Sequence, residues 1–132
     1  MPKRLRIRAG EVTSIAVLNE TPTATAIWQA LPIEARANTW GDEIYFSIPV
    51  HQSVESKASD VVALGDVAYW PPGNAFCIFF GPTPASHGNE IRAASAVNVV
   101  GRLEGDPTTF RKVSSGTRIV LEAIETRVEQ RE

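Results

Sequence analysis

The segment from Gly65 to Gly81, GDVAYWPPGNAFCIFFG, constrains the fold more than any other part of the chain. Pro71-Pro72-Gly73-Asn74 is typical of a tight type II turn, with Pro72 at its second position and Gly73 at the third, where φ must be positive. Ala75–Phe80 is a continuous apolar run, which indicates a strand buried on both faces. This hairpin predicts a barrel-like or sandwiched β core.

The length of the chain is that of one domain. With 132 residues it can bury about two-thirds of the surface exposed by its unfolded chain. We expect a single domain over residues 1–125 and a charged tail over residues 126–132. No apolar run approaches the roughly 20 residues of a membrane helix, and the basic N-terminal segment lacks the apolar region of a signal peptide. We therefore expect a cytoplasmic protein with no membrane partner.

Two short helices and further strands are expected around the hairpin. Thr21-Pro22 and Asp106-Pro107 each place a capping side chain before a proline, which is typical of a helix start. Residues 50–60 and 85–96 are expected to be loops. Residues 61–64 are expected to lead into the hairpin, and strands are expected at residues 3–8, 12–18, 33–40, 43–48, 97–103 and after Gly116. With the hairpin these make about eight strands, which fits a barrel with helices over its openings.

Several classes of function lack support in the sequence. His51 and His87 are isolated from other metal-ligating residues, and no glycine-rich phosphate loop is present, so we expect no metal and no cofactor. The basic stripe over residues 3–8 is interpreted as a solvated strand face, because a net charge of −2 does not favour nucleic-acid binding. The single cysteine, Cys77, lies in the most apolar strand and is expected to be a buried, inert thiol.

Aromatic residues gather near the turns. Trp40 and Trp70 stand at strand ends beside Gly41 and Pro71, positions that form the rims of barrel mouths. Tyr45 and Tyr69 lie close to them in sequence, and Glu43 shares a strand face with Tyr45. Two interpretations remain open: these side chains pack in the core, or they line a pocket for a ligand.

Three segments carry a family resemblance: residues 38–46 (NTWGDEIYF), residues 65–84 and residues 94–103 (ASAVNVVGRL). They resemble a small prokaryotic family with a minimal cyclophilin-like fold. The resemblance implies a mainly β protein, a closed eight-stranded barrel with two short helices capping it. It also implies a family whose biological role is unsettled.

True cyclophilins are prolyl isomerases, and the resemblance implies where such a site would lie. An arginine must hydrogen-bond the amide nitrogen of the twisted peptide bond, and Arg36 is the counterpart in this chain. The phenylalanine, histidine, methionine and glutamine that accompany this arginine in active cyclophilins are absent here. Residues 72–80 look like the peptide-binding hairpin, with Asn74 on its turn and either Phe79 or Phe80 as its floor, but the strand contains no glutamine.

We therefore expect an uncharacterised cyclophilin-like domain that binds a peptide or a small apolar ligand in an aromatic cleft, without efficient isomerase activity. The residues expected to contact this ligand are Trp40, Glu43, Tyr45, Tyr69, Trp70, Asn74 and Phe79. One alternative is a weak prolyl isomerase that uses Arg36. A different enzyme with Glu43 as its acid or base, and a homodimer closed by exposed apolar residues, are further alternatives.

Overall fold

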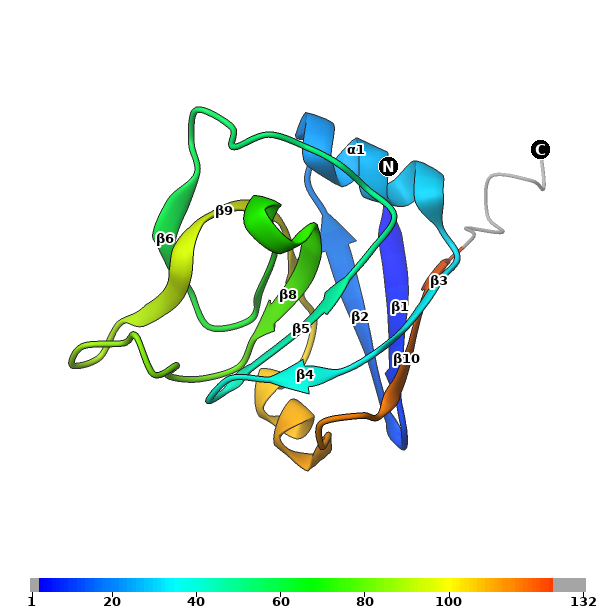
Figure 1. The fold of residues 1–132 in the computed structure, drawn as a ribbon. Coiled ribbons are helices and arrows are strands. Elements are labelled where there is room, and N and C mark those ends of the chain that lie inside the picture. The colour runs from blue at the N-terminus through cyan, green and yellow to red at the C-terminus, as the bar shows by residue number, and fades with distance from the viewer. Residues whose placement is uncertain (1–2, 125–132) are drawn as a thin grey trace, which may run out of the picture.

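The computed structural model describes residues 3–124, and the protein is mainly β (Figure 1). The helices are α1 (Pro22–Ala30) and the short 3-10 helices η1 (Pro71–Gly73) and η2 (Pro107–Lys112). The strands within these residues are β1 (Arg4–Ala9), β2 (Val12–Leu18), β3 (Ile33–Arg36), β4 (Asn38–Thr39), β5 (Glu43–Ser47), β6 (Ser59–Val62), β7 (Asp66–Trp70), β8 (Ala75–Phe79), β9 (Ile91–Leu103) and β10 (Arg118–Ala123). No helix in this part of the chain is long and apolar enough to cross a membrane. Residue 125 and the charged tail expected at 126–132 lie outside the described residues.

The strands form one curled antiparallel sheet in the order β3-β10-β1-β2-β9-β7-β8-β5-β4, and β6 pairs separately with β9. Within residues 3–124 no ladder joins β3 to β4, so the expected closed, eight-stranded barrel is wrong. The single strand expected at residues 33–40 is also wrong. Its two pieces meet at Ala37, whose N–H donates to the Thr117 carbonyl and whose carbonyl accepts from Gly116. The sheet stays open because its two end strands are consecutive pieces of one chain, paired with β10 and β5 respectively.

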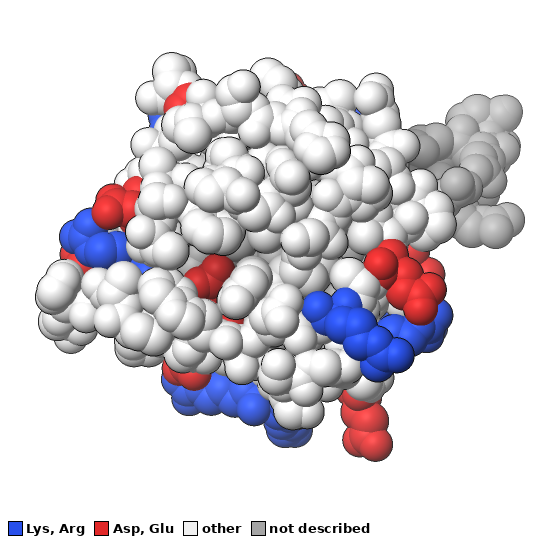
Figure 2. Space-filling model, in the orientation of Figure 1, with Lys and Arg blue, Asp and Glu red and all other residues white. Residues whose placement is uncertain are grey.

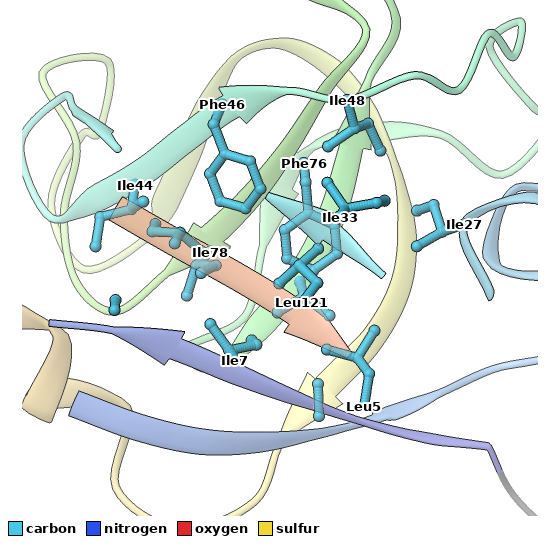
Figure 3. Close-up of a cluster of buried hydrophobic side chains, with 14 of the residues drawn as sticks. Leu5, Ile7, Ile27, Ile33, Ile44, Phe46, Ile48, Phe76, Ile78 and Leu121 are labelled. Atoms are coloured by element: carbon cyan, nitrogen blue, oxygen red, sulfur yellow. The ribbon is translucent and has the colours of Figure 1, made fainter. Parts of the chain in front are cut away.

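The main core fills the inside of the curled sheet. Figure 3 shows Phe46 and Phe76 facing the aliphatic side chains of the opposite strands, among them Ile7 and Leu121. The rings of Phe46 and Phe76 pack with their centroids 5.5 Å apart. These residues alternate along their strands, because every second side chain of a strand points to the same face of the sheet. The core therefore follows from the period-two pattern of the sequence.

Helices cover the two ends of this core, at the starts predicted from the sequence. The Thr21 side chain accepts a hydrogen bond from the Ala24 N–H at 3.2 Å, and α1 buries Ile27 against the sheet. Asp106 caps η2 in the same way, accepting from the Thr108 N–H at 3.0 Å, and Phe110 of η2 is fully buried. Figure 1 shows α1 and η2 at opposite ends of the molecule, as expected for capping helices.

The turn between β7 and β8 differs from the expected type II turn. It is a 3-10 turn, and the residue in the left-handed conformation is Asn74, at φ 48°, rather than Gly73. The glycine is required for space: a Cβ on Gly73 would lie 2.9 Å from the indole of Trp70. Asn tolerates positive φ better than most residues, so the strained position falls on Asn74 while Gly73 makes room for the ring.

A second layer lies on the outer face of the sheet. The C-terminal half of β9 pairs with β2 and β7, whereas its N-terminal half pairs with β6. A second apolar cluster forms there, made of Val62, Ala68, Ala75, Cys77, Phe79, Ile91, Ala93 and Val97. Strand β8 separates the two clusters, with Phe76 and Ile78 in the main core and Cys77 and Phe79 in the second. The prediction of a strand buried on both faces is confirmed.

Candidate functional site

A pocket of about 240 Å³ opens on the second apolar cluster. Three parts of the chain form it: the turn between β4 and β5 with the start of β5, the end of β7, and the N-terminal half of β9. The lining residues are Trp40, Glu43, Tyr45, Trp70, Ala93, Ala94 and Val97. Trp40 and Trp70, which are 30 positions apart in the sequence, therefore border the same cavity.

Strand pairing explains why these side chains converge. Glu43 and Tyr45 are two positions apart in β5, so both point to the outer face. Tyr45 is paired with Cys77 of β8, and Trp70 of β7 is paired with Ala75, which lies on the same face of β8 as Cys77. The register of three neighbouring strands thus places two aromatic side chains and one carboxyl on a common surface.

The indole of Trp70 is held at both ends. Its N–H donates to the Ser95 hydroxyl at 2.7 Å, and its ring lies over Gly73. The remaining pocket wall is apolar, since β9 contributes only alanine and valine to it. A fixed aromatic wall of this kind is typical of sites for small ligands, because little conformational entropy is lost when the ligand binds.

Glu43 supplies the charge of the pocket. The residue is only 5% exposed. Burial raises the pKa of Glu43 to about 7, an effect that a hydrogen bond with the Cys77 thiol partly offsets. Within residues 3–124 no ion pair involves Glu43, whereas the neighbouring Asp42 pairs with Arg111 at 3.2 Å. Glu43 is therefore a buried carboxyl, without a cation, at a cavity wall.

Cys77 lies beneath this carboxyl as an inert thiol. The residue is 1% exposed, and burial together with the Glu43 carboxyl raises the pKa of the thiol well above its usual value. A thiol held in its protonated form is a poor nucleophile. The position matches the buried, unreactive cysteine predicted from the sequence.

The face of the molecule seen in Figure 2 is largely uncharged over β5 and β8. Its basic and acidic side chains gather towards the edges, and acidic atoms also lie recessed among uncharged ones.

The basic stripe of β1 is matched by acidic partners: Arg4 pairs with Glu104, and Arg6 and Arg8 with Glu122. This stripe is thus a surface of ion pairs.

The other residues expected at the site lie elsewhere. Tyr69 is fully buried on the opposite face of β7, where its hydroxyl lies 2.6 Å from the Val50 carbonyl and 2.9 Å from Oδ1 of Asn74. Phe79 is fully buried in the second cluster below the pocket. Arg36 is exposed on β3, donates to the Gly116 carbonyl at 3.1 Å and does not line the pocket.

The β9 wall of the pocket was not predicted. Residues 85–96 are expected to be a loop, but β9 begins at Ile91, and Ala93 and Ala94 line the pocket. The signal available in the sequence is the alternation of the apolar residues Ile91 and Ala93 with the charged Arg92. Alanine contributes little to an apolar pattern, and the pairing with β6 is distant in sequence.

Comparisons with known proteins agree with the fold. The family model described as Cyclophilin-like matches residues 3–122. The solution structure of a hypothetical protein from Archaeoglobus fulgidus is similar to this chain, with 47% sequence identity and a TM-score of 0.80. That similarity covers 93% of this chain and 95% of the archaeal one. No curated protein matches the chain.

Proposed function

This chain belongs to the cyclophilin-like family, and from this premise we propose that it is a binding domain. Its aromatic pocket takes a small, largely apolar ligand, which is either a free molecule or a side chain of a short peptide. The observation that carries the proposal is the convergence on one cavity of Trp40 from the turn before β5, Tyr45 from β5 and Trp70 from β7. Aromatic side chains that line a hollow leave apolar surface in water, and a ligand that covers this surface gains the free energy of its burial.

The three tryptophans of the chain provide the test. Trp40 and Trp70 line the pocket, whereas Trp28 of α1 packs against the main core. Each tryptophan has one indole N–H, which gives a separate signal in a ¹H–¹⁵N NMR spectrum. We expect titration with small aromatic compounds to shift the signals of Trp40 and Trp70 and to leave that of Trp28 in place.

A result in which no compound moves the Trp40 and Trp70 signals at millimolar concentration would contradict the proposal. Equal shifts of all three signals would indicate non-specific binding and would contradict it too. Trp70→Ala tests whether the ligand binds in this pocket, because the substitution removes one wall of the pocket and should weaken binding. Trp28→Ala is its control, and it should leave binding intact because Trp28 does not line the pocket.

The isomerase alternative receives no support from the pocket. Catalysis of prolyl isomerisation requires a donor aimed at the amide nitrogen as its resonance is lost. The pocket lining contains no arginine, and Arg36 donates to a backbone carbonyl of its own chain. An assay on a proline-containing tetrapeptide, with wild type beside Arg36→Ala, decides the question. Acceleration by the wild type that is lost in the variant would establish the isomerase.

A further inference from the structure

The polar groups of the pocket are few, and only one of them is charged. Among its lining residues, all within the described part of the chain, Glu43 is the single carboxylic acid, and no lysine, arginine or histidine is present. The N–H of Trp70 is already engaged by Ser95. A ligand in this pocket therefore meets aromatic and aliphatic walls and one carboxyl.

The cations near the pocket are committed to other acids. Arg111 pairs with Asp42 at 3.2 Å, and Arg92 of β9 pairs with both Asp60 and Glu90 at 2.6 Å. Burying a carboxylate without a cation beside it costs free energy, since water solvates its charge less well. The structure thus places an acceptor with unsatisfied charge at the wall of the pocket.

Resting on the proposed function, we propose that the ligand of this pocket carries a protonated amine, which pairs with the Glu43 carboxylate while its apolar body lies among Trp40, Tyr45 and Trp70. Two separate features favour a cation there. The carboxylate gains a charge-assisted hydrogen bond, which is about twice as strong as a neutral one. The aromatic walls add a cation–π attraction, which is absent for a neutral ligand.

The size of the pocket limits the amine to a small molecule or a single side chain. Its volume is about 240 Å³, slightly below the range of about 300–1,000 Å³ that is typical of ligand pockets. A compound with one ring and a short amine-bearing arm fits this volume. The matched probes are therefore 2-phenylethylamine and 2-phenylethanol, which share shape and size and differ in the charge of the terminal group.

Affinity for the amine should depend on pH through Glu43. The titratable group that acts on this carboxyl is the Cys77 thiol from β8. Among the other residues that line the pocket, β5 adds the hydroxyl of Tyr45, while β7 and β9 add only uncharged side chains. The pKa of Glu43, about 7 in the free protein, means that a proton competes with the amine below neutral pH. Binding should be about tenfold weaker at pH 6 than at pH 8, since each pH unit below the pKa lowers the ionised fraction about tenfold.

The experiment measures the dissociation constants of both probes by NMR titration of the Trp40 and Trp70 indole signals at pH 6 and pH 8. The variants are wild type, Glu43→Gln and the control Glu34→Gln, which removes an exposed acid of β3 that pairs with Arg118. In the wild type and in the control we expect the amine to bind at least about tenfold more tightly than the alcohol at pH 8. In Glu43→Gln this preference and its pH dependence should disappear while the alcohol still binds.

The outcomes separate this inference from the proposed function. If the alcohol binds to the wild type as tightly as the amine at pH 8, the pocket binds ligands but the amine preference is wrong. If the amine preference survives in Glu43→Gln, the carboxyl is not its source, and the inference is again overturned. If neither probe binds at millimolar concentration, the proposed function itself fails. The wild-type pH dependence needs no variant, so the test holds even if Glu43→Gln does not fold.

Discussion

The indole N–H of Trp70 donates a 2.7 Å hydrogen bond to the hydroxyl of Ser95, and this contact ties the end of β7 to the middle of β9. It occurs at the register shift of the ladder between β6 and β9. The ladder with β6 has partners at Arg92 and Val97, and the ladder with β7 begins at Asn98. Ser95 thus fixes the pocket wall within the β6 ladder, in the irregular stretch of β9 between the paired residues Arg92 and Val97.

Replacing Ser95 by alanine should loosen this wall. The lost hydrogen bond should lower the free energy of unfolding by about 1 kcal/mol or less, because the serine is exposed and water replaces part of the bond. The clearer effect is local: the indole N–H of Trp70 should exchange faster with solvent, as measured by NMR. The exposed Ser56 provides the control variant, Ser56→Ala. Unchanged exchange at Trp70 in Ser95→Ala would show that the hydrogen bond does not hold the ring.

Much of the fold could be predicted because its signals are local. The caps Thr21 and Asp106 mark their helices within two or three residues, and the apolar run of β8 reports burial on both faces. The open sheet and the β6–β9 layer could not be predicted in this way. They depend on the bend at Ala37 and on pairing between Ser59–Val62 and the start of β9, which are far apart in sequence.

Part of the candidate site could also be predicted from the sequence. Glu43 and Tyr45 share a face through the two-residue period of a strand, and both line the pocket. The same rule excludes Tyr69 once Trp70 is placed, because adjacent strand residues point to opposite faces. That Trp40 reaches the cavity of Trp70 depends on the pairing of β5, β8 and β7, which no local pattern reports.

The buried carboxyl of Glu43 should make the stability of the protein depend on pH. Its pKa is raised from 4.5 to about 7 by burial. Below pH 4.5 both the folded and the unfolded state hold the proton. Between pH 4.5 and about pH 7 only the unfolded state releases this proton. The free energy of unfolding therefore falls as the pH rises through this range, by a total on the order of 3 kcal/mol. Above pH 7 this contribution levels off.

Chemical denaturation of wild type and Glu43→Gln from pH 4 to pH 8 measures this effect. The difference in the free energy of unfolding between the two proteins reports Glu43 alone, because any contribution of His51 and His87 is present in both. We expect the wild type to lose stability relative to the variant as the pH rises through this range. Parallel stability curves for the two proteins would show that Glu43 ionises as readily in the folded state as in the unfolded one.

Glu55 should hold the loop between β5 and β6 against α1. Its carboxylate accepts hydrogen bonds from the N–H, at 3.0 Å, and from the hydroxyl of Thr23 in the first turn of α1. Its own N–H donates to Oδ1 of Asn98 at 2.8 Å, and the Asn98 amide also donates to the Ser53 carbonyl at 2.9 Å. The loop is thus fastened to both the helix and β9.

Glu55→Ala should lower the free energy of unfolding by about 2 kcal/mol, as expected for hydrogen bonds to a charged acceptor. Hydrogen exchange should quicken at the Thr23 amide and over residues 50–58. Glu55→Gln keeps one acceptor oxygen and should recover part of the loss. Lys57→Ala, an exposed change in the same loop, should have little effect. Equal exchange rates in Glu55→Ala and Lys57→Ala would mean that the loop is held by other contacts.

Gly101 should be among the least replaceable residues of β9. A Cβ at this position would lie 2.3 Å from the carbonyl oxygen of Val17 in the neighbouring strand, and backbone cannot move aside as a flexible side chain does. The register also shifts beside it, because Val67 pairs with Gly101 but Ala68 pairs with Val99. A bulge and a close backbone approach thus occur together at this glycine.

Gly101→Ala should therefore lower the free energy of unfolding by about 3 kcal/mol or more, as measured by urea denaturation. The matched control is Gly88→Ala, because a Cβ on Gly88 meets no atom within 4 Å and only its φ of 63° opposes alanine. That strain should cost about 1–2 kcal/mol. Equal losses in the two variants would mean that β2 and β9 separate easily at Gly101, so that the added methyl group is accommodated without breaking the ladder between them.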